Sequence, residues 1–197
     1  MSLISATQSP LIDALPGGRN LAVKVAIAIA GSALLAISAK VQVPFYPVPV
    51  TMQTLVVLVL GMTLGSRLGF ATLALYLAEG LAGLPVFAGT PEKGIGLAYM
   101  MGPTGGYLIG YLLAATLTGW LAERGFDRSL RSVALALVLG NVAIYLPGVL
   151  WLGAVIGWDK PVLAYGLTPF LAGDALKLAL GACLLPLLRN AAPGSKR

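Results

Sequence analysis

The sequence predicts an all-α integral membrane protein, a bundle of six transmembrane helices that forms one domain over residues 1–197. Of its 197 residues, 58% are hydrophobic and only 10% are charged. Soluble domains carry about a quarter of charged residues, so a water-facing surface cannot be made from this composition. The 25 glycines also indicate a membrane protein, because close helix contacts in lipid favour small residues.

Six apolar runs follow one another between residues 20 and 188, and roughly twenty residues cross a hydrocarbon core of about 30 Å; the second run is short and the fifth is long. The segment 85–103 is polar and rich in glycine, and it is too long for a minimal connector, which predicts a functional loop. We expect residues 1–19 to be a cytoplasmic lead-in, since they lack the apolar stretch of a signal peptide, and 189–197 to be a cytoplasmic tail. The runs are 21–39, 50–64, 68–84, 104–121, 130–156 and 168–188.

The basic residues predict the orientation in the cell membrane. Six spans place both termini on one side, and cytoplasmic termini put nine basic residues at the inner face against three at the outer face, as the positive-inside rule requires. The inner set is Arg19, Lys24, Arg67, Arg124, Arg128, Arg131, Arg189, Lys196 and Arg197, and the outer set is Lys40, Lys93 and Lys160.

Several function classes are excluded by residue content. The chain has no histidine and one cysteine, which excludes disulfides, histidine-ligated metals and histidine-dependent triads within it. The basic residues do not cluster with aromatics, so nucleic acid is not an expected partner. The spans carry no set of residues for catalysis, so we expect no enzyme, no catalytic residue, no metal and no cofactor. There is also no G-x-x-x-x-G-K-[ST] loop for ATP hydrolysis.

Ionisable residues inside lipid are costly and therefore informative. Asp174 and Lys177 lie three positions apart in the last run, so both project from one face of a helix. They form either a structural ion pair or part of a recess that binds a ligand from outside. Asn141 and Tyr145, one turn apart in the fifth run, either extend that recess or bridge helices.

Small residues recur at every fourth position on two of the runs. On the first run, Ala22, Ala26 and Ala30 form a face for internal packing or for the docking of a separate protein. On the fourth run, the same spacing predicts close packing of another helix, or a wall beside a ligand; its members are Gly102, Gly106, Gly110, Ala114 and Thr118.

Four motifs in one order resemble a known family. The chain closely resembles the biotin-specific substrate-binding (S) components of energy-coupling factor (ECF) transporters, the BioY family, over residues 20–188. The motifs are Val48-Pro-Val-Thr-Met-Gln-Thr54, Gly83-Leu-Pro-Val-Phe-Ala88, Gly102-Pro-Thr-Gly-Gly-Tyr107 and Gly173-Asp-Ala-Leu-Lys177.

The resemblance implies six helices with both termini inside, and an outward pocket for biotin as the transported ligand. It implies a transmembrane coupling protein and two ATPase subunits as partners, docked on the alanine face of the first helix. The candidate substrate-binding residues are Asp174, Lys177, Asn141, Tyr145, Gly106, Tyr107, Thr90 and Phe87. Relatives carry a ligand-contacting asparagine in the loop after Ala88, where this chain reads Gly89-Thr-Pro-Glu-Lys93; Thr90 and Asn141 are candidates to replace that contact.

We therefore predict a subunit that captures biotin from the outside for ATP-driven uptake by an ECF-type transporter. The alternative within transport is a stand-alone secondary transporter of a small carboxylate-bearing vitamin, acting as a monomer or as an oligomer. A membrane enzyme would need catalytic residues that the spans lack. A structural scaffold would not need Asp174 and Lys177.

Overall fold

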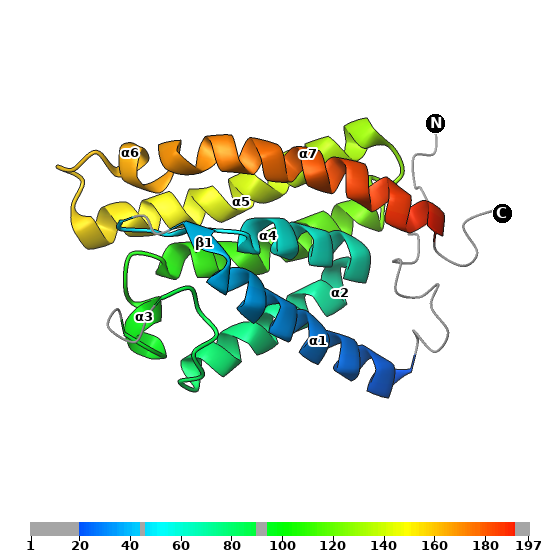
Figure 1. The fold of residues 1–197 in the computed structure, drawn as a ribbon, viewed down its shortest axis with the longest axis horizontal. Coiled ribbons are helices and arrows are strands. Elements are labelled where there is room, and N and C mark those ends of the chain that lie inside the picture. The colour runs from blue at the N-terminus through cyan, green and yellow to red at the C-terminus, as the bar shows by residue number, and fades with distance from the viewer. Residues whose placement is uncertain (1–19, 44–45, 90–93, 192–197) are drawn as a thin grey trace, which may run out of the picture.

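The computed structural model describes residues 20–43, 46–89 and 94–191, and most of them are helical. Figure 1 shows the helices side by side in a bundle. Within these residues, five helical stretches have the length and the apolar composition to cross a membrane. The helices are α1 (Leu21–Lys40), α2 (Gln53–Leu81), α3 (Leu97–Met100), α4 (Gly105–Ala122), α5 (Leu130–Ile156), α6 (Val162–Gly166) and α7 (Thr168–Ala191).

The count of five differs from the six predicted runs because the second and third runs both lie on α2. This helix reverses direction at Gly65, whose φ of 80° lies in the left-handed region that favours glycine. The Gln53 amide donates a 2.7 Å hydrogen bond to the Tyr76 hydroxyl, although these residues would lie about 35 Å apart along a straight helix. Two antiparallel arms, 53–64 and 66–81, therefore stand where the sequence predicts two helices with a short connector.

Helix α4 lies between α2 and α5, and α1 packs on α2 from the other side. The small residues on α4 make this possible. At Gly110, for example, an added Cβ would lie 2.7 Å from the Cα of Ile144 on α5. Ala114, Ala115 and Thr118 are fully buried on the same helix. Helix α4 is thus the centre of the bundle, as the predicted small-residue face requires.

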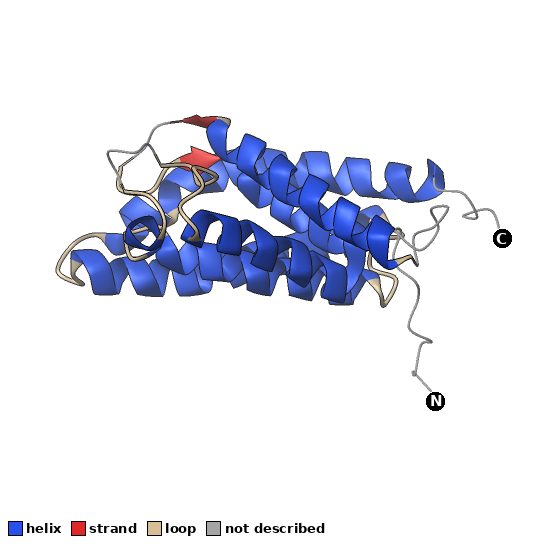
Figure 2. Cartoon of the chain, turned by 90° about the horizontal axis from the view of Figure 1, so that it is seen from below, coloured by secondary structure: helices blue, strands red, loops and turns tan. Residues whose placement is uncertain are grey.

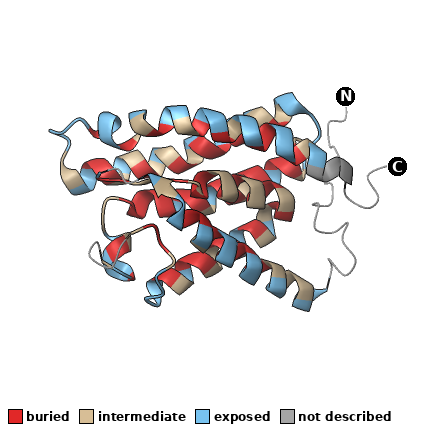
Figure 3. Ribbon diagram, in the orientation of Figure 1, coloured by how far each residue is buried: buried red, intermediate tan, exposed pale blue. Residues whose placement is uncertain are grey.

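The outward faces of the helices are apolar. Leucines and isoleucines remain exposed along α1 and α7, and Figure 3 shows the exposed residues on the outer side of the bundle. So much apolar surface is unfavourable in water but suits lipid, where helices satisfy their own backbone groups. The fold is that of a multi-pass membrane protein. Examples are Leu21, Ile29, Ile37, Leu171, Leu176, Leu180 and Leu187.

The connections gather at two ends of the bundle. At one end lie α3, α6 and a two-stranded antiparallel ribbon, β1 (Gln42–Val43) with β2 (Val50–Thr51). Figure 2 shows both strands at that end. The predicted runs leave residues 157–167 as a connection, and the structure forms α6 within it.

At the other end, the reversal of α2 meets the connection between α4 and α5. The Glu123 carboxylate there accepts hydrogen bonds from the backbone N–H and the hydroxyl of Ser66, at 2.8 and 2.9 Å. Helix α1 begins and α7 ends at this same end (Figure 1).

Candidate functional site

The site begins with an ion pair inside the bundle. On α7, the Lys177 ammonium lies 2.9 Å from the Asp174 carboxylate, and the two residues are 7% and 3% exposed. Their spacing of three residues places them on one helix face, as predicted. A buried pair of this kind persists only when further hydrogen bonds satisfy it.

Those hydrogen bonds come from the end of β2, from the start of α2 and from α5. Lys177 donates to the Thr51 carbonyl at 2.7 Å and to the Thr54 hydroxyl at 3.0 Å. Tyr145, on α5, donates to the second oxygen of Asp174. An ammonium has three N–H groups, and here they match three acceptors. A ligand that accepts from Lys177 must therefore displace one of them.

A cavity lies beside this pair, at the end of the bundle that carries α3 and the ribbon. Its volume, counted as the space that can hold the centre of a water molecule, is ≈ 30 Å³. A ligand larger than a few waters therefore requires its walls to move apart. The lining is mostly apolar and aromatic with a few polar groups, as in small-molecule sites generally. It includes Val48, Thr51, Gln53, Thr54, Ala88, Tyr99, Thr104, Tyr107, Tyr111, Tyr145, Phe170 and Lys177.

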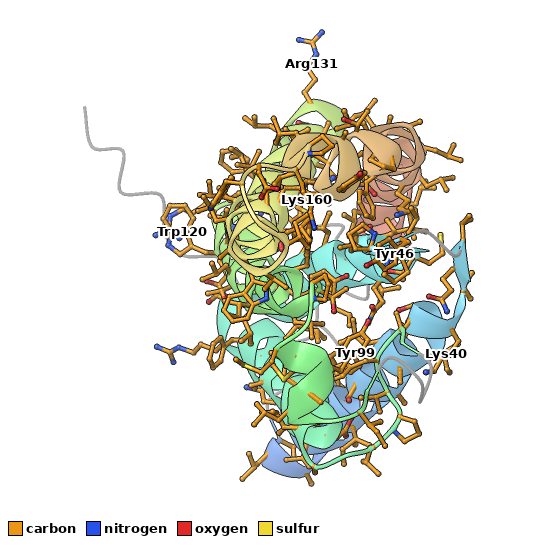
Figure 4. All side chains as sticks on the ribbon, turned by 90° about the vertical axis from the view of Figure 1, so that its left-hand side faces the viewer. Lys40, Tyr46, Tyr99, Trp120, Arg131 and Lys160 are labelled. Atoms are coloured by element: carbon orange, nitrogen blue, oxygen red, sulfur yellow. The ribbon has the colours of Figure 1, made fainter. Side chains whose placement is uncertain are left out.

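One wall of the cavity is held by contacts around Phe87. Its ring fills the space over Gly80, where an added Cβ would lie 2.0 Å from the ring, and it stacks on Tyr99 at 5.2 Å between centroids. Its carbonyl accepts a 2.6 Å hydrogen bond from Lys40, at the end of α1, and the neighbouring Val86 carbonyl accepts one from Tyr76 at 3.0 Å. Figure 4 labels Tyr99 and Lys40 at this end of the molecule. The wall is thus anchored to both α1 and α2.

Tyr99 itself lies on α3, outside the helices that could cross a membrane. Burial raises the pKa of its hydroxyl above the ordinary value of 10. The hydroxyl therefore stays protonated at neutral pH, and this part of the wall is uncharged.

A second hollow lies between α5 and the α6–α7 segment and is open to the side of the bundle. Its walls are apolar apart from Asn141, Tyr145 and Asp174. Tyr145 lines both hollows, so its hydrogen bond to Asp174 lies on the boundary between them. The Oδ1 atom of Asn141 is buried and has no hydrogen-bond partner among the described residues.

The structure brings together some of the predicted site residues and separates others. Lys177, Tyr145 and Tyr107 line the cavity, and Asp174 accepts hydrogen bonds from three of its wall residues, Tyr145, Lys177 and Thr54. Phe87 lies behind the wall that Ala88 and Tyr99 form.

The remaining predicted residues lie elsewhere. Gly106 packs on α5, where an added Cβ would lie 2.3 Å from the Cβ of Trp151. Asn141 lines the lateral hollow, and Thr90 lies outside the described residues. No distance to a ligand tests these assignments, which stay predictions.

Sequence reasoning missed the polar residues at the end of β2 and the start of α2. Thr51, Gln53 and Thr54 all line the cavity, and two of them bond to Lys177. They lie within one of the motifs that carry the family resemblance, but their order alone does not say which side chains face α7. The signal that could have found them is three polar residues in a row of four at the start of an apolar run.

The alanine face of α1 remains open in the structure. Ala22, Ala26 and Ala30 are all exposed, whereas Ala28, Gly31 and Leu35 face the bundle and are buried. This face is therefore not used for packing within the described residues.

Fold and site together define a helical membrane protein with a small cavity near one end of its bundle, bordered by the buried ion pair. Comparison with known proteins gives the family. Residues 10–194 match the model of the BioY family. The chain belongs to this family.

Relatives and a solved structure agree with that assignment. The chain is 35% identical to the probable biotin transporter BioY of Pyrococcus horikoshii, over 80% of this chain and 91% of the relative. It is also 35% identical to the biotin transporter BioY of Thermotoga maritima, over 81% and 91%. The crystal structure of an S-component for biotin from an ECF-type ABC transporter shares the fold, with a TM-score of 0.73 and 24% identity over 89% of this chain and 95% of that one.

Proposed function

We propose that this protein captures biotin from outside the cell, as the substrate-binding subunit of an ECF-type importer. One observation carries the proposal: a buried Asp174–Lys177 pair borders the cavity of a chain whose family members are named biotin transporters. The chemistry is complementary. Biotin has two ureido N–H donors, a ureido carbonyl, a carboxylate and an apolar bicycle, and the site has a carboxylate, an ammonium and aromatic walls.

The binding step follows from the exchange of hydrogen bonds at Lys177. In the structure its three N–H groups bond to Asp174, Thr51 and Thr54. An acceptor on biotin replaces one of them, and Asp174 accepts from a ureido N–H. Both charges then remain paired, which avoids the cost of a buried charge without a partner.

We also propose six membrane crossings with both termini in the cytoplasm. The support is the reversal of α2 at Gly65, which gives two antiparallel arms, and the asymmetry of basic residues along the chain. The arm 53–64 is short for a full crossing, and β2 precedes it at the outer end.

Energy for uptake comes from partners in this proposal. The chain has no phosphate-binding loop for ATP, and its exposed Ala22, Ala26 and Ala30 offer a flat surface on α1 for a transmembrane coupling protein that works with two ATPase subunits. No protein cofactor is required.

The deciding experiment is direct binding of biotin to the purified chain in detergent or nanodiscs, with thiamine and riboflavin as controls. We expect saturable binding of biotin alone, without ATP. Equal binding of all three vitamins, or of none, would refute the proposal. Accumulation in vesicles that contain this chain alone, driven by an ion gradient, would instead support a secondary transporter.

A further inference from the structure

Gln53 lies at the start of α2, 2% exposed, on the wall of the cavity. A side-chain amide has an acceptor oxygen and a donor nitrogen, and only its surroundings decide which way each one points. The surroundings of Gln53 contain enough fixed groups to decide this.

The nitrogen of Gln53 has two neighbours. It donates to the Leu35 carbonyl of α1 at 3.4 Å and to the Tyr76 hydroxyl at 2.7 Å. A carbonyl can only accept, so the contact with Leu35 requires the nitrogen on that side. Tyr76 in turn donates its one proton to the Val86 carbonyl at 3.0 Å, which leaves the hydroxyl oxygen to accept from Gln53. Two acceptor-only carbonyls therefore fix the amide in one orientation.

The amide oxygen of Gln53 makes no hydrogen bond to the described residues. It is also not fully enclosed by them. Because the nitrogen is held by Leu35 and Tyr76, the free oxygen is the atom that Gln53 can offer to the cavity it lines. An acceptor in a mostly apolar, narrow cavity favours a ligand that brings a donor, since an unpaired polar atom there is costly.

We infer that Gln53 is a specificity-determining residue, whose oxygen accepts a hydrogen bond from an N–H of the ligand, with Tyr76 as the positioning residue that fixes its polarity. The inference rests on the proposed function for the identity of the ligand. The Gln53 oxygen would accept a hydrogen bond from one ureido N–H of biotin, and Asp174 would accept one from the other. Gln53 also supplies an acceptor at a site where Asn141 faces the lateral hollow instead of the cavity.

The test measures the affinity of the purified full chain for biotin and for its two mono-N-methylated ureido analogues. In Gln53→Met, which keeps the length and removes the amide, we expect biotin to bind roughly tenfold more weakly or worse. One of the two analogues lacks the N–H that donates to Gln53. For this analogue, Gln53→Met should change the affinity by less than threefold. Gln42→Met is the matched control, because Gln42 lies in β1 and outside the cavity lining, and it should bind all three ligands as the wild type does.

Tyr76→Phe is a second, independent test of the inference if Gln53→Met does not fold. It keeps the ring that packs against Phe87 and removes the hydroxyl that orients the amide. We expect weaker biotin binding and a smaller difference between biotin and the discriminating analogue. Unchanged affinities in folded Gln53→Met or Tyr76→Phe, or an equal loss for all three ligands, would overturn the inference while leaving biotin binding by the wild type intact. A wild type that does not bind biotin would overturn both.

Discussion

The hydroxyl of Tyr145, on α5, donates a hydrogen bond to the carboxylate of Asp174, on α7. This bond joins the two helices that border the lateral hollow, and it lies where that hollow meets the cavity. Hydrogen bonds to charged groups contribute about 1.5–3 kcal/mol. The bond therefore both closes the site on one side and holds α5 against α7.

Tyr145→Phe should lower stability by removing this bond. We expect a drop in the free energy of unfolding of about 1.5–3 kcal/mol, measured as a lower unfolding midpoint in detergent. Tyr165→Phe is the matched control, since Tyr165 is 38% exposed on α6 and should change little. Equal midpoints for the two variants would show that the bond contributes nothing to the fold.

Asp174 and Lys177 can be tested as ligand contacts by single and double substitution. Asp174→Asn turns one acceptor oxygen into a donor, and Lys177→Met keeps the length and removes the charge. Each should weaken biotin binding by about 1.5–3 kcal/mol, or tenfold and more, and the double variant should bind no better than either single one. Titration calorimetry on folded protein measures this.

A purely structural pair predicts the opposite pattern. Each single change would then leave an uncompensated buried charge and lower stability, and the double change would restore folding. Near-normal biotin affinity in a well-folded double variant would remove both residues from the site.

Gly106→Ala should destabilise the fold, because its Cβ would lie 2.3 Å from the Cβ of Trp151 and 2.4 Å from the Pro147 carbonyl. Overpacking of this kind costs about 1–3 kcal/mol, seen as a lower unfolding midpoint. Gly173→Ala is the control on α7, where the nearest atom, on Val50, is 4.0 Å away. If Gly106→Ala keeps its midpoint and loses biotin affinity instead, the residue belongs to the ligand wall.

Ala26→Leu should reduce uptake by the complete transporter without changing biotin binding. Ala26 is exposed on α1, so a larger side chain disturbs a docked partner and not the bundle. Uptake of labelled biotin by cells that express the partners, and binding to the purified chain, are measured together. Ala154→Leu, at an exposed position near the C-terminal end of α5, is the control. Loss of binding in Ala26→Leu would mean that this face packs within the chain.

The orientation can be checked by labelling single cysteines in a Cys183→Ala background, because Cys183 is exposed. Cysteines at positions 93 and 160 should react with an impermeant reagent added to intact cells, and a cysteine at position 128 should not. Figure 4 shows Lys160 in the connection at the end of the bundle that faces the viewer. Labelling of position 128 from outside would reverse the proposed topology.

The sequence by itself determined the class of protein and part of its site. The chain has apolar runs near the length of a membrane crossing and few charges, so these runs are removed from water by lipid. This predicted a helical membrane protein. A spacing of three residues is enough to place Asp174 and Lys177 on one helix face, and they form the 2.9 Å ion pair. Local periodicity suffices for such features, since one helix defines them.

Only the tertiary structure decided what that pair contacts. Thr54 lies 120 residues from Asp174, and Gln53 meets Tyr76 because α2 reverses at a single glycine, where the sequence predicted a connector. The packing of α4 on α5 likewise turned Gly106 away from the cavity, and the packing of α1 on α2 left Ala26 exposed. These outcomes depend on how helices far apart in the chain pack together, and residue patterns within one helix do not determine that packing.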